Sequence, residues 1–169
     1  MPSTHVDDPA FGAVEVTVDP GTAQVTVRGR ALPQVSIRRR PGIASDRRTP
    51  IGSRAAADLE LLVDGEPVPV RPALAFVSRR SRRVDVRYRS HDYRFYPTTG
   101  TRSVLARDGQ PIGDLHVPAG AGTRAHWPAG SGVTGAEAAL AYALAAAFGI
   151  GSPGPVKSAI GAGAISPPF

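Results

Sequence analysis

Arginines dominate the residues of this sequence that could do chemistry, and they are densest near its midpoint. The candidate anion-binding residues are Arg79, Arg80, Arg82, Arg83, Arg87, Arg89 and Arg94. A guanidinium group presents a planar fork of N–H donors that matches the paired oxygens of a phosphate or carboxylate. The cluster therefore predicts the binding of an anionic partner. The alternative is a solvated basic edge whose charge opposes aggregation of the sheet.

The positive charge is concentrated in the middle of the chain. Residues 28–107 carry 18 basic and 7 acidic side chains, whereas the other residues carry 2 basic and 7 acidic ones. Such a field attracts the phosphates of a lipid surface or of a nucleic acid. Arginine outnumbers lysine 19 to 1, so the excess also fits a compositional bias, because charge runs usually form solvated faces.

Nucleic acid is the less favoured partner for this cluster, because aromatic side chains must accompany the basic ones to stack on bases. Strand alternation directs Tyr88, Tyr93 and Phe95 inward and leaves Tyr96 as the exposed platform. The sequence contains no helix-turn-helix, zinc-finger or RNP-type pattern.

A second group of arginines lies in or beside a segment rich in Pro, Gly and Ser, residues 39–54, that is expected to be a mobile loop. This loop could fold over a ligand or simply move. The group consists of Arg38, Arg39, Arg40, Arg47, Arg48 and Arg54.

Catalysis and metal binding have little support in the sequence. The chain has no cysteine, which excludes thiolate chemistry and cysteine-ligated zinc. An enzyme pocket could be built from His91, Asp92, His116 and His126 if the fold gathered them. Together with Asp114 these residues offer nitrogen and oxygen ligands for a metal, but no pair has helical i, i+4 spacing. No nucleophile elbow or P-loop is present. We therefore expect a non-enzymatic protein that uses no cofactor and no metal.

Alternating apolar and polar residues predict a series of short antiparallel strands. They are expected at residues 14–18, 24–28, 34–38, 58–63, 66–70, 72–77, 83–89, 93–96, 101–107 and 110–117. Asp64-Gly65 and Asp108-Gly109 are typical of type I′ hairpin turns. Pro67 and Pro69 lack N–H donors, which favours a sheet edge for their segment.

One helix is expected at residues 134–149. Thr134 and Glu137 have the spacing of a capping box, and Gly149 marks the end of the helix. The residues between them have no polar stripe, and a helix that is apolar on every side must be surrounded by protein. The predicted fold is therefore mainly β, a closed antiparallel barrel that encloses this helix.

A single domain is expected at residues 11–150, because a chain of 169 residues has enough apolar surface for one core. Residues 1–10 are expected to form a flexible N-terminus and residues 151–169 a Gly/Pro-rich tail. No secretory signal is visible and the longest apolar run is too short to cross a bilayer, so the expected location is the cytoplasm. The tail offers an alternative function, a structural subunit that docks on a neighbouring chain. The oligomeric state is left open.

The order of these parts resembles the tubby C-terminal-like fold, the group of tubby, the phospholipid scramblases and the LURP-one-related proteins. The resemblance rests on residues 93–96 and 105–113, which are similar to that family's strand followed by an arginine, acidic, glycine and isoleucine-glycine hairpin before an apolar helix. It covers about residues 11–150. The resemblance implies a barrel around a central helix and, as in eukaryotic members that bind phosphoinositides, docking of an anionic phospholipid headgroup at the membrane periphery. No headgroup motif of that family maps onto named positions of this chain.

Overall fold

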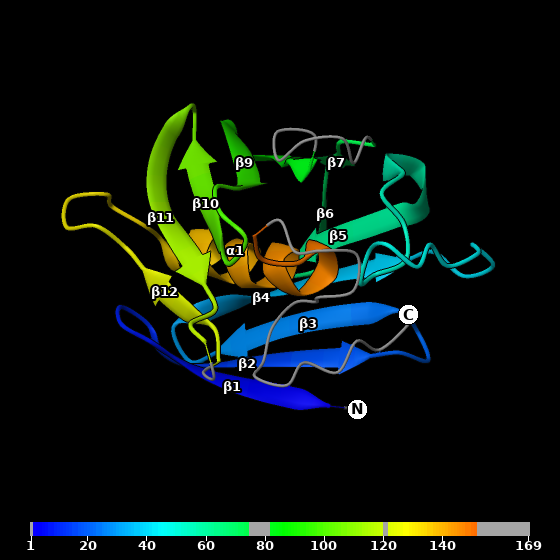
Figure 1. Cartoon of the computed structure of the whole chain (residues 1–169), viewed down its shortest axis with the longest axis horizontal. Coiled ribbons are helices and arrows are strands. Elements are labelled where there is room, and N and C mark those ends of the chain that lie inside the picture. The colour runs from blue at the N-terminus through cyan, green and yellow to red at the C-terminus, as the bar shows by residue number, and fades with distance from the viewer. Residues whose placement is uncertain (1, 75–81, 120–121, 152–169) are drawn as a thin grey trace.

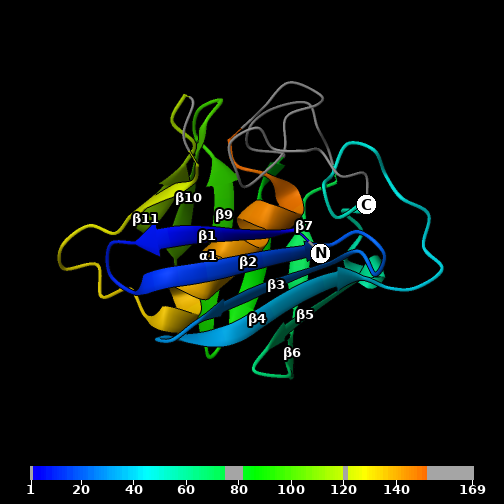
Figure 2. The ribbon, with the colours of Figure 1, turned by 90° about the horizontal axis from the view of Figure 1, so that it is seen from below.

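The computed structural model describes residues 2–74, 82–119 and 122–151. Two antiparallel sheets of six strands each lie on either side of a single helix, α1 (Gly135–Phe148) (Figure 1). A view from below shows α1 between the two sheets (Figure 2). Within each sheet every strand pairs with its neighbours in the sequence, so both sheets are meanders.

The strands divide between the sheets at the middle of the chain. The first sheet contains β1 (Ser3–Asp8), β2 (Gly12–Asp19), β3 (Gln24–Gly29), β4 (Leu32–Arg39), β5 (Leu59–Val63) and β6 (Glu66–Val68). The second contains β7 (Val70–Pro72), β8 (Val84–Tyr88), β9 (His91–Pro97), β10 (Arg102–Arg107), β11 (Gln110–His116) and β12 (Arg124–His126). A short 3-10 turn, η1 (Ala56–Asp58), precedes β5.

The prediction of a mainly β fold with one helix is confirmed, but the predicted closed barrel is not. Within the described residues, strand pairing stops between β6 and β7 and between β12 and β1. Pro69 separates β6 from β7, and because proline has no N–H to donate, the ladder ends there and the chain passes into the other sheet. The expected edge position of Pro67 is confirmed by the place of β6 in the strand order.

Helix α1 forms the centre of the core, as its apolar sequence predicts. The N–H of Glu137 donates to Thr134 Oγ1, and the Glu137 carboxylate accepts the N–H of Thr134, which completes the predicted capping box. Gly149 ends the helix with a φ of 94°. Every residue from 137 to 147 is buried. The many alanines make the helix thin, so that strands of both sheets can pack closely against it.

Both Asp-Gly hairpin turns are confirmed. Asp64 and Gly65 have φ values of 48° and 82°, and Asp108 and Gly109 have values of 50° and 84°. Two consecutive residues with positive φ are the requirement of a type I′ turn. These turns set the register of the hairpins β5–β6 and β10–β11.

The N-terminus differs from the expectation of a flexible segment, because Ser3–Asp8 forms the edge strand β1. Asp8 is buried and accepts hydrogen bonds from Trp127 Nε1 at 2.9 Å and from the Tyr142 hydroxyl at 2.6 Å. This buried carboxylate connects β1 to the helix and to the segment that follows β12. The sequence prediction also missed β12, which lies in a stretch rich in Gly, Ala and Pro.

The loop expected to be mobile is packed against the helix end. Ile51 is fully buried, and its N–H donates to the carbonyl oxygen of Ala147, one of the last in α1. Arg39 holds the loop by donating to the carbonyl oxygens of Ile43 and Ile51. Half of the strand predicted at residues 72–77 and nearly all of the tail lie outside the described residues.

Gly113 provides a test of how β11 packs. A Cβ at this position would overlap the indole ring of Trp127 and approach the carbonyl oxygen of His126. We expect Gly113→Ala to destabilise the fold by about 1–3 kcal/mol, because overpacking forces neighbouring groups to move. Urea unfolding measures the effect, with Gly100→Ala as control, since a Cβ there meets no atom within 4 Å. Equal stability of the two variants would contradict the contact between Trp127 and Gly113.

Candidate anion-binding face

Charge separates the two sheets. The strands of the first sheet carry three basic and six acidic side chains, whereas the strands of the second carry six basic and three acidic ones. Three of the four histidines, His91, His116 and His126, also belong to the second sheet. We call the solvent-facing side of β7–β12 the basic face.

The basic face is hollowed over β7, β8 and β9. An open groove of about 1200 Å³ lies there. The residues of the groove that bear charge or an aromatic ring include Arg71, Arg83, Arg87, Arg94, Asp85 and Tyr96. The register explains this convergence, because Asp85 is opposite Arg71 on one side and Arg94 on the other. Residues directly opposite in neighbouring strands point to the same face of a sheet.

Acidic side chains hold the arginines of the groove in place. Arg94 Nε donates to Asp85 Oδ1 at 2.8 Å, and Arg87 Nη1 lies 2.9 Å from Asp92 Oδ1. The hydrogen bond to Asp92 raises the pKa of the Arg87 guanidinium, so the group stays cationic. Ion pairs at such exposed positions contribute little to stability. Their effect is to order the guanidinium groups while lowering the net charge of the groove.

The structure brings together only part of the predicted arginine cluster. Arg83, Arg87 and Arg94 line the groove, whereas Arg79 and Arg80 lie outside the described residues. The carbonyl oxygen of Arg82 accepts a hydrogen bond from Arg54, at 3.0 Å.

The predicted alignment of Arg89 with Arg87 is wrong. Strand β8 ends at Tyr88, and Arg89 lies in the following turn with a φ of 46°. Its guanidinium carbon lies 5.5 Å from the centre of the Tyr88 ring. Strand alternation therefore does not apply to Arg89.

Arg71 is the groove residue that the sequence analysis missed. It lies on β7 between Val70 and Pro72, which are both buried. The alternation of exposed Arg71 with buried neighbours is the signal that could have found it, but the sequence analysis placed Arg71 at the break between two predicted strands, residues 66–70 and 72–77.

Two arginines of the second group, Arg39 and Arg54, hold the loop to the core, whereas Arg38, Arg40, Arg47 and Arg48 are exposed. Arg54 is buried and donates to the carbonyl oxygens of Ala73 and Arg83. Burial lowers the pKa of Arg54 to about 10, so it remains charged at neutral pH. Arg38, at the other end of the group, pairs with Glu60 at 2.7 Å.

The enzyme pocket considered from the sequence does not form. His91 Nδ1 pairs with Asp108 Oδ2 at 2.5 Å beside the β10–β11 turn. His116 lies at the other end of the sheet, opposite Arg102. Within the described residues, no three or more His, Cys, Asp or Glu side chains are grouped so that they could hold a metal ion.

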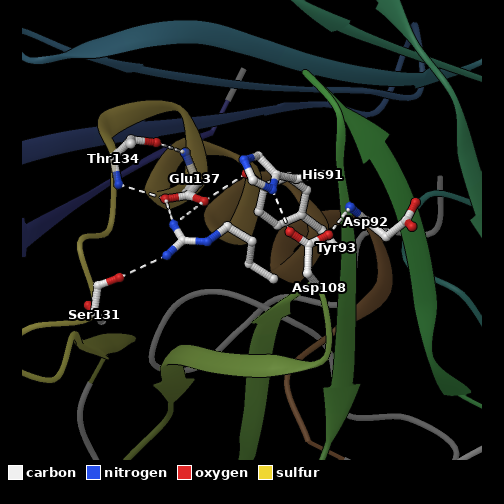
Figure 3. A network of polar contacts seen from close by, with 8 residues as sticks. His91, Asp92, Tyr93, Asp108, Ser131, Thr134 and Glu137 are labelled. Atoms are coloured by element: carbon white, nitrogen blue, oxygen red, sulfur yellow. Dashed lines mark hydrogen bonds and ion pairs between the residues drawn. The ribbon is translucent and has the colours of Figure 1, made fainter.

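A buried polar network fastens the basic face to the helix (Figure 3). The Glu137 carboxylate accepts hydrogen bonds from the Tyr93 hydroxyl at 2.7 Å and from Arg107 Nη1 at 2.8 Å. Arg107 Nη2 also donates to the carbonyl oxygen of Ser131. Burial, followed by the hydrogen bond to Glu137, raises the pKa of Tyr93, so its hydroxyl remains a donor. The sequence analysis identified Glu137 only as a helix cap.

No family model matches the chain, and no curated protein or solved structure is significantly similar to it. The resemblance to the tubby C-terminal-like fold therefore stays a prediction. In the described part of the chain no helix has the length and apolar character that crossing a membrane requires.

Proposed function

We propose that this protein is a non-enzymatic binding module that docks its basic face on an anionic phospholipid surface. The observation that carries the proposal is the separation of charge between the two sheets, together with an open groove on the basic face that four arginines and three aspartates line. An acidic sheet behind a basic one orients the molecule in the field of a negative surface.

Several modest contacts would supply the affinity. A basic residue close to an anionic membrane contributes about 1 kcal/mol, and the attraction fades within a Debye length of about 8 Å at physiological salt. Arg71 and Arg83 on the groove are therefore expected to act together with Arg87 and Arg94. Binding should weaken steeply as salt is added. The alternative of docking through the tail concerns residues outside the described part of the chain.

Reversing two charges of the groove tests this function. We expect Arg71→Glu combined with Arg87→Glu to weaken binding to vesicles of phosphatidylglycerol in phosphatidylcholine by on the order of 30-fold or more, since two contacts of about 1 kcal/mol are lost. Both side chains are exposed, so the fold should be preserved. Cosedimentation at fixed salt measures the loss.

The matched control is Arg28→Glu combined with Arg38→Glu on the first sheet. Arg38 pairs with Glu60 as Arg87 pairs with Asp92, and Arg28 is exposed as Arg71 is. Each double variant reverses two arginines, so both change the net charge equally. Retention of binding by the control alone supports docking through the basic face. Equal loss in both would show that only net charge matters. Unchanged binding of the groove variant, or tighter binding to an oligonucleotide than to vesicles, would reject the proposal.

A further inference from the structure

Five ionisable side chains meet on the basic face beyond the groove, on β10, β11 and β12. The strand register places Asp114 opposite His126, and His116 opposite both Arg102 and Arg124. All five side chains point to the same side of the sheet, because Leu115 between Asp114 and His116 is fully buried on the other side.

Within this group, the Asp114 carboxylate is bonded to Arg102 but not to either histidine. Its Oδ1 accepts a hydrogen bond from Arg102 Nη1. The Nδ1 atom of His116 lies 3.9 Å from Asp114 Oδ1, and that of His126 lies 3.6 Å from Oδ2. Both separations exceed hydrogen-bond length. The carboxylate charge is thus balanced by Arg102, and the two imidazoles are near it without being bound to it.

His116 is an unusual member of the group because its Nδ1 atom is buried without a hydrogen-bond partner. Burial, then the neighbouring Arg102, lowers the pKa of His116, while Asp114 acts in the opposite direction and Arg124 and His126 add to the lowering. This imidazole is therefore neutral at pH 7.5 and takes up a proton only in acid.

Protonation of His116 would double the charge of the pairing around it. Arg102 and Arg124 outweigh Asp114 by a single positive charge while His116 is neutral, and a His116 imidazolium would raise this to two. We propose that His116, together with Arg102 and Arg124, forms a proton-dependent subsite for phosphate groups, which extends the basic face in acid. The inference rests on the proposed function, since the phosphate groups are those of the docked lipid surface.

The subsite connects with the groove through the register. Tyr96 of the groove is opposite Val104, and Val104 is opposite Asp114. Strands lie about 4.8 Å apart, so the two parts lie on the order of 10 Å from each other on one surface. A lipid surface can contact both at once.

Vesicles containing phosphatidylglycerol, whose charge is constant over this range, provide the first test. We expect the wild-type protein to bind them about 5-fold more tightly near pH 5.5 than near pH 7.5, since one cationic group is added. His116→Gln should remove this increase and keep the affinity at the higher pH. His5→Gln on β1, exposed on the first sheet, is the control and should retain the increase. Circular dichroism at both pH values verifies the fold.

The outcomes separate the two proposals. Wild-type binding that is equal at both pH values, or an increase that survives in the His116→Gln variant, would overturn the subsite and leave the docking function intact. Absence of vesicle binding at both pH values would overturn the docking function. In that case inorganic phosphate decides the subsite, because it should shift the ring proton resonances of His116 in acid. Unshifted resonances would overturn the subsite as well.

Discussion

Leu144→Asp is expected to abolish the folded state. Leu144 is fully buried in α1, and the helix is enclosed by both sheets. The buried residues of α1 include no basic side chain that could pair with a carboxylate at this position. Burying an unpaired charge costs several kcal/mol or forces the group to become neutral. A domain of this size has a total stability of about 5–15 kcal/mol. Circular dichroism and urea unfolding should show loss of the cooperative transition at neutral pH.

Leu144→Met is the control for this experiment. It keeps nearly the same volume without adding a charge, and such substitutions usually cost less than about 1.5 kcal/mol. A Leu144→Asp protein that unfolds cooperatively with a midpoint close to that of the Met variant would contradict the enclosure of the helix. The architecture as a whole depends on this enclosure, because α1 lies between the two sheets and contacts strands of both.

Local patterns were sufficient to predict the parts of the fold that local chemistry determines. The uniform apolar character of residues 138–148 predicted burial of the helix on all sides, and both Asp-Gly turns adopt the expected backbone. Closure of the barrel could not be read in the same way, because it depends on whether the first and last strands pair. Strand β1 escaped prediction because its inward positions include Asp8, a buried carboxylate whose side-chain partners, Trp127 and Tyr142, are distant in the sequence.

The candidate site was predicted in its residue type and general position, but not in its electrostatics. Alternation placed Arg87 on the outer face correctly. The pairing of Arg87 with Asp92 and of Arg94 with Asp85 depends on cross-strand register, which a single sequence does not fix without the turn geometry. The turn at Arg89 could not be predicted either, because a positive φ is unusual for arginine and no Gly or Asn marks the turn in the sequence.

The network around Glu137 links the enclosed helix to the strands of the basic face. Tyr93 belongs to β9 and Arg107 to β10, and both donate to this one carboxylate at the start of α1. The outer side of the same strands carries Arg94 and lines the groove. A rigid attachment of β9 and β10 to the core keeps the guanidinium groups of the groove in fixed positions, which reduces the entropy lost on docking.

Glu137→Ala is expected to destabilise the fold by about 3–5 kcal/mol, the range for removing one partner of a buried ion pair. The change would leave Arg107, the Tyr93 hydroxyl and the Thr134 N–H without their shared acceptor. Glu137→Gln keeps the shape and one acceptor oxygen, so its loss should be smaller. Urea unfolding at neutral pH measures both, with Asp92→Ala as control, because that carboxylate is exposed and its pair should be worth at most about 1 kcal/mol.

The same carboxylate should give the protein part of its sensitivity to acid. Burial alone would raise the pKa of Glu137, but hydrogen bonds from Tyr93, Thr134 and Arg107 outweigh it and the pKa is lowered. In the unfolded chain a glutamate titrates near pH 4.3, about its ordinary value. Its contribution to stability is therefore complete above that pH and is lost as the pH falls through the lower folded value. The Ala variant should lose less stability than wild type over this acid range, and identical slopes would show that Glu137 is not held as a charged acceptor.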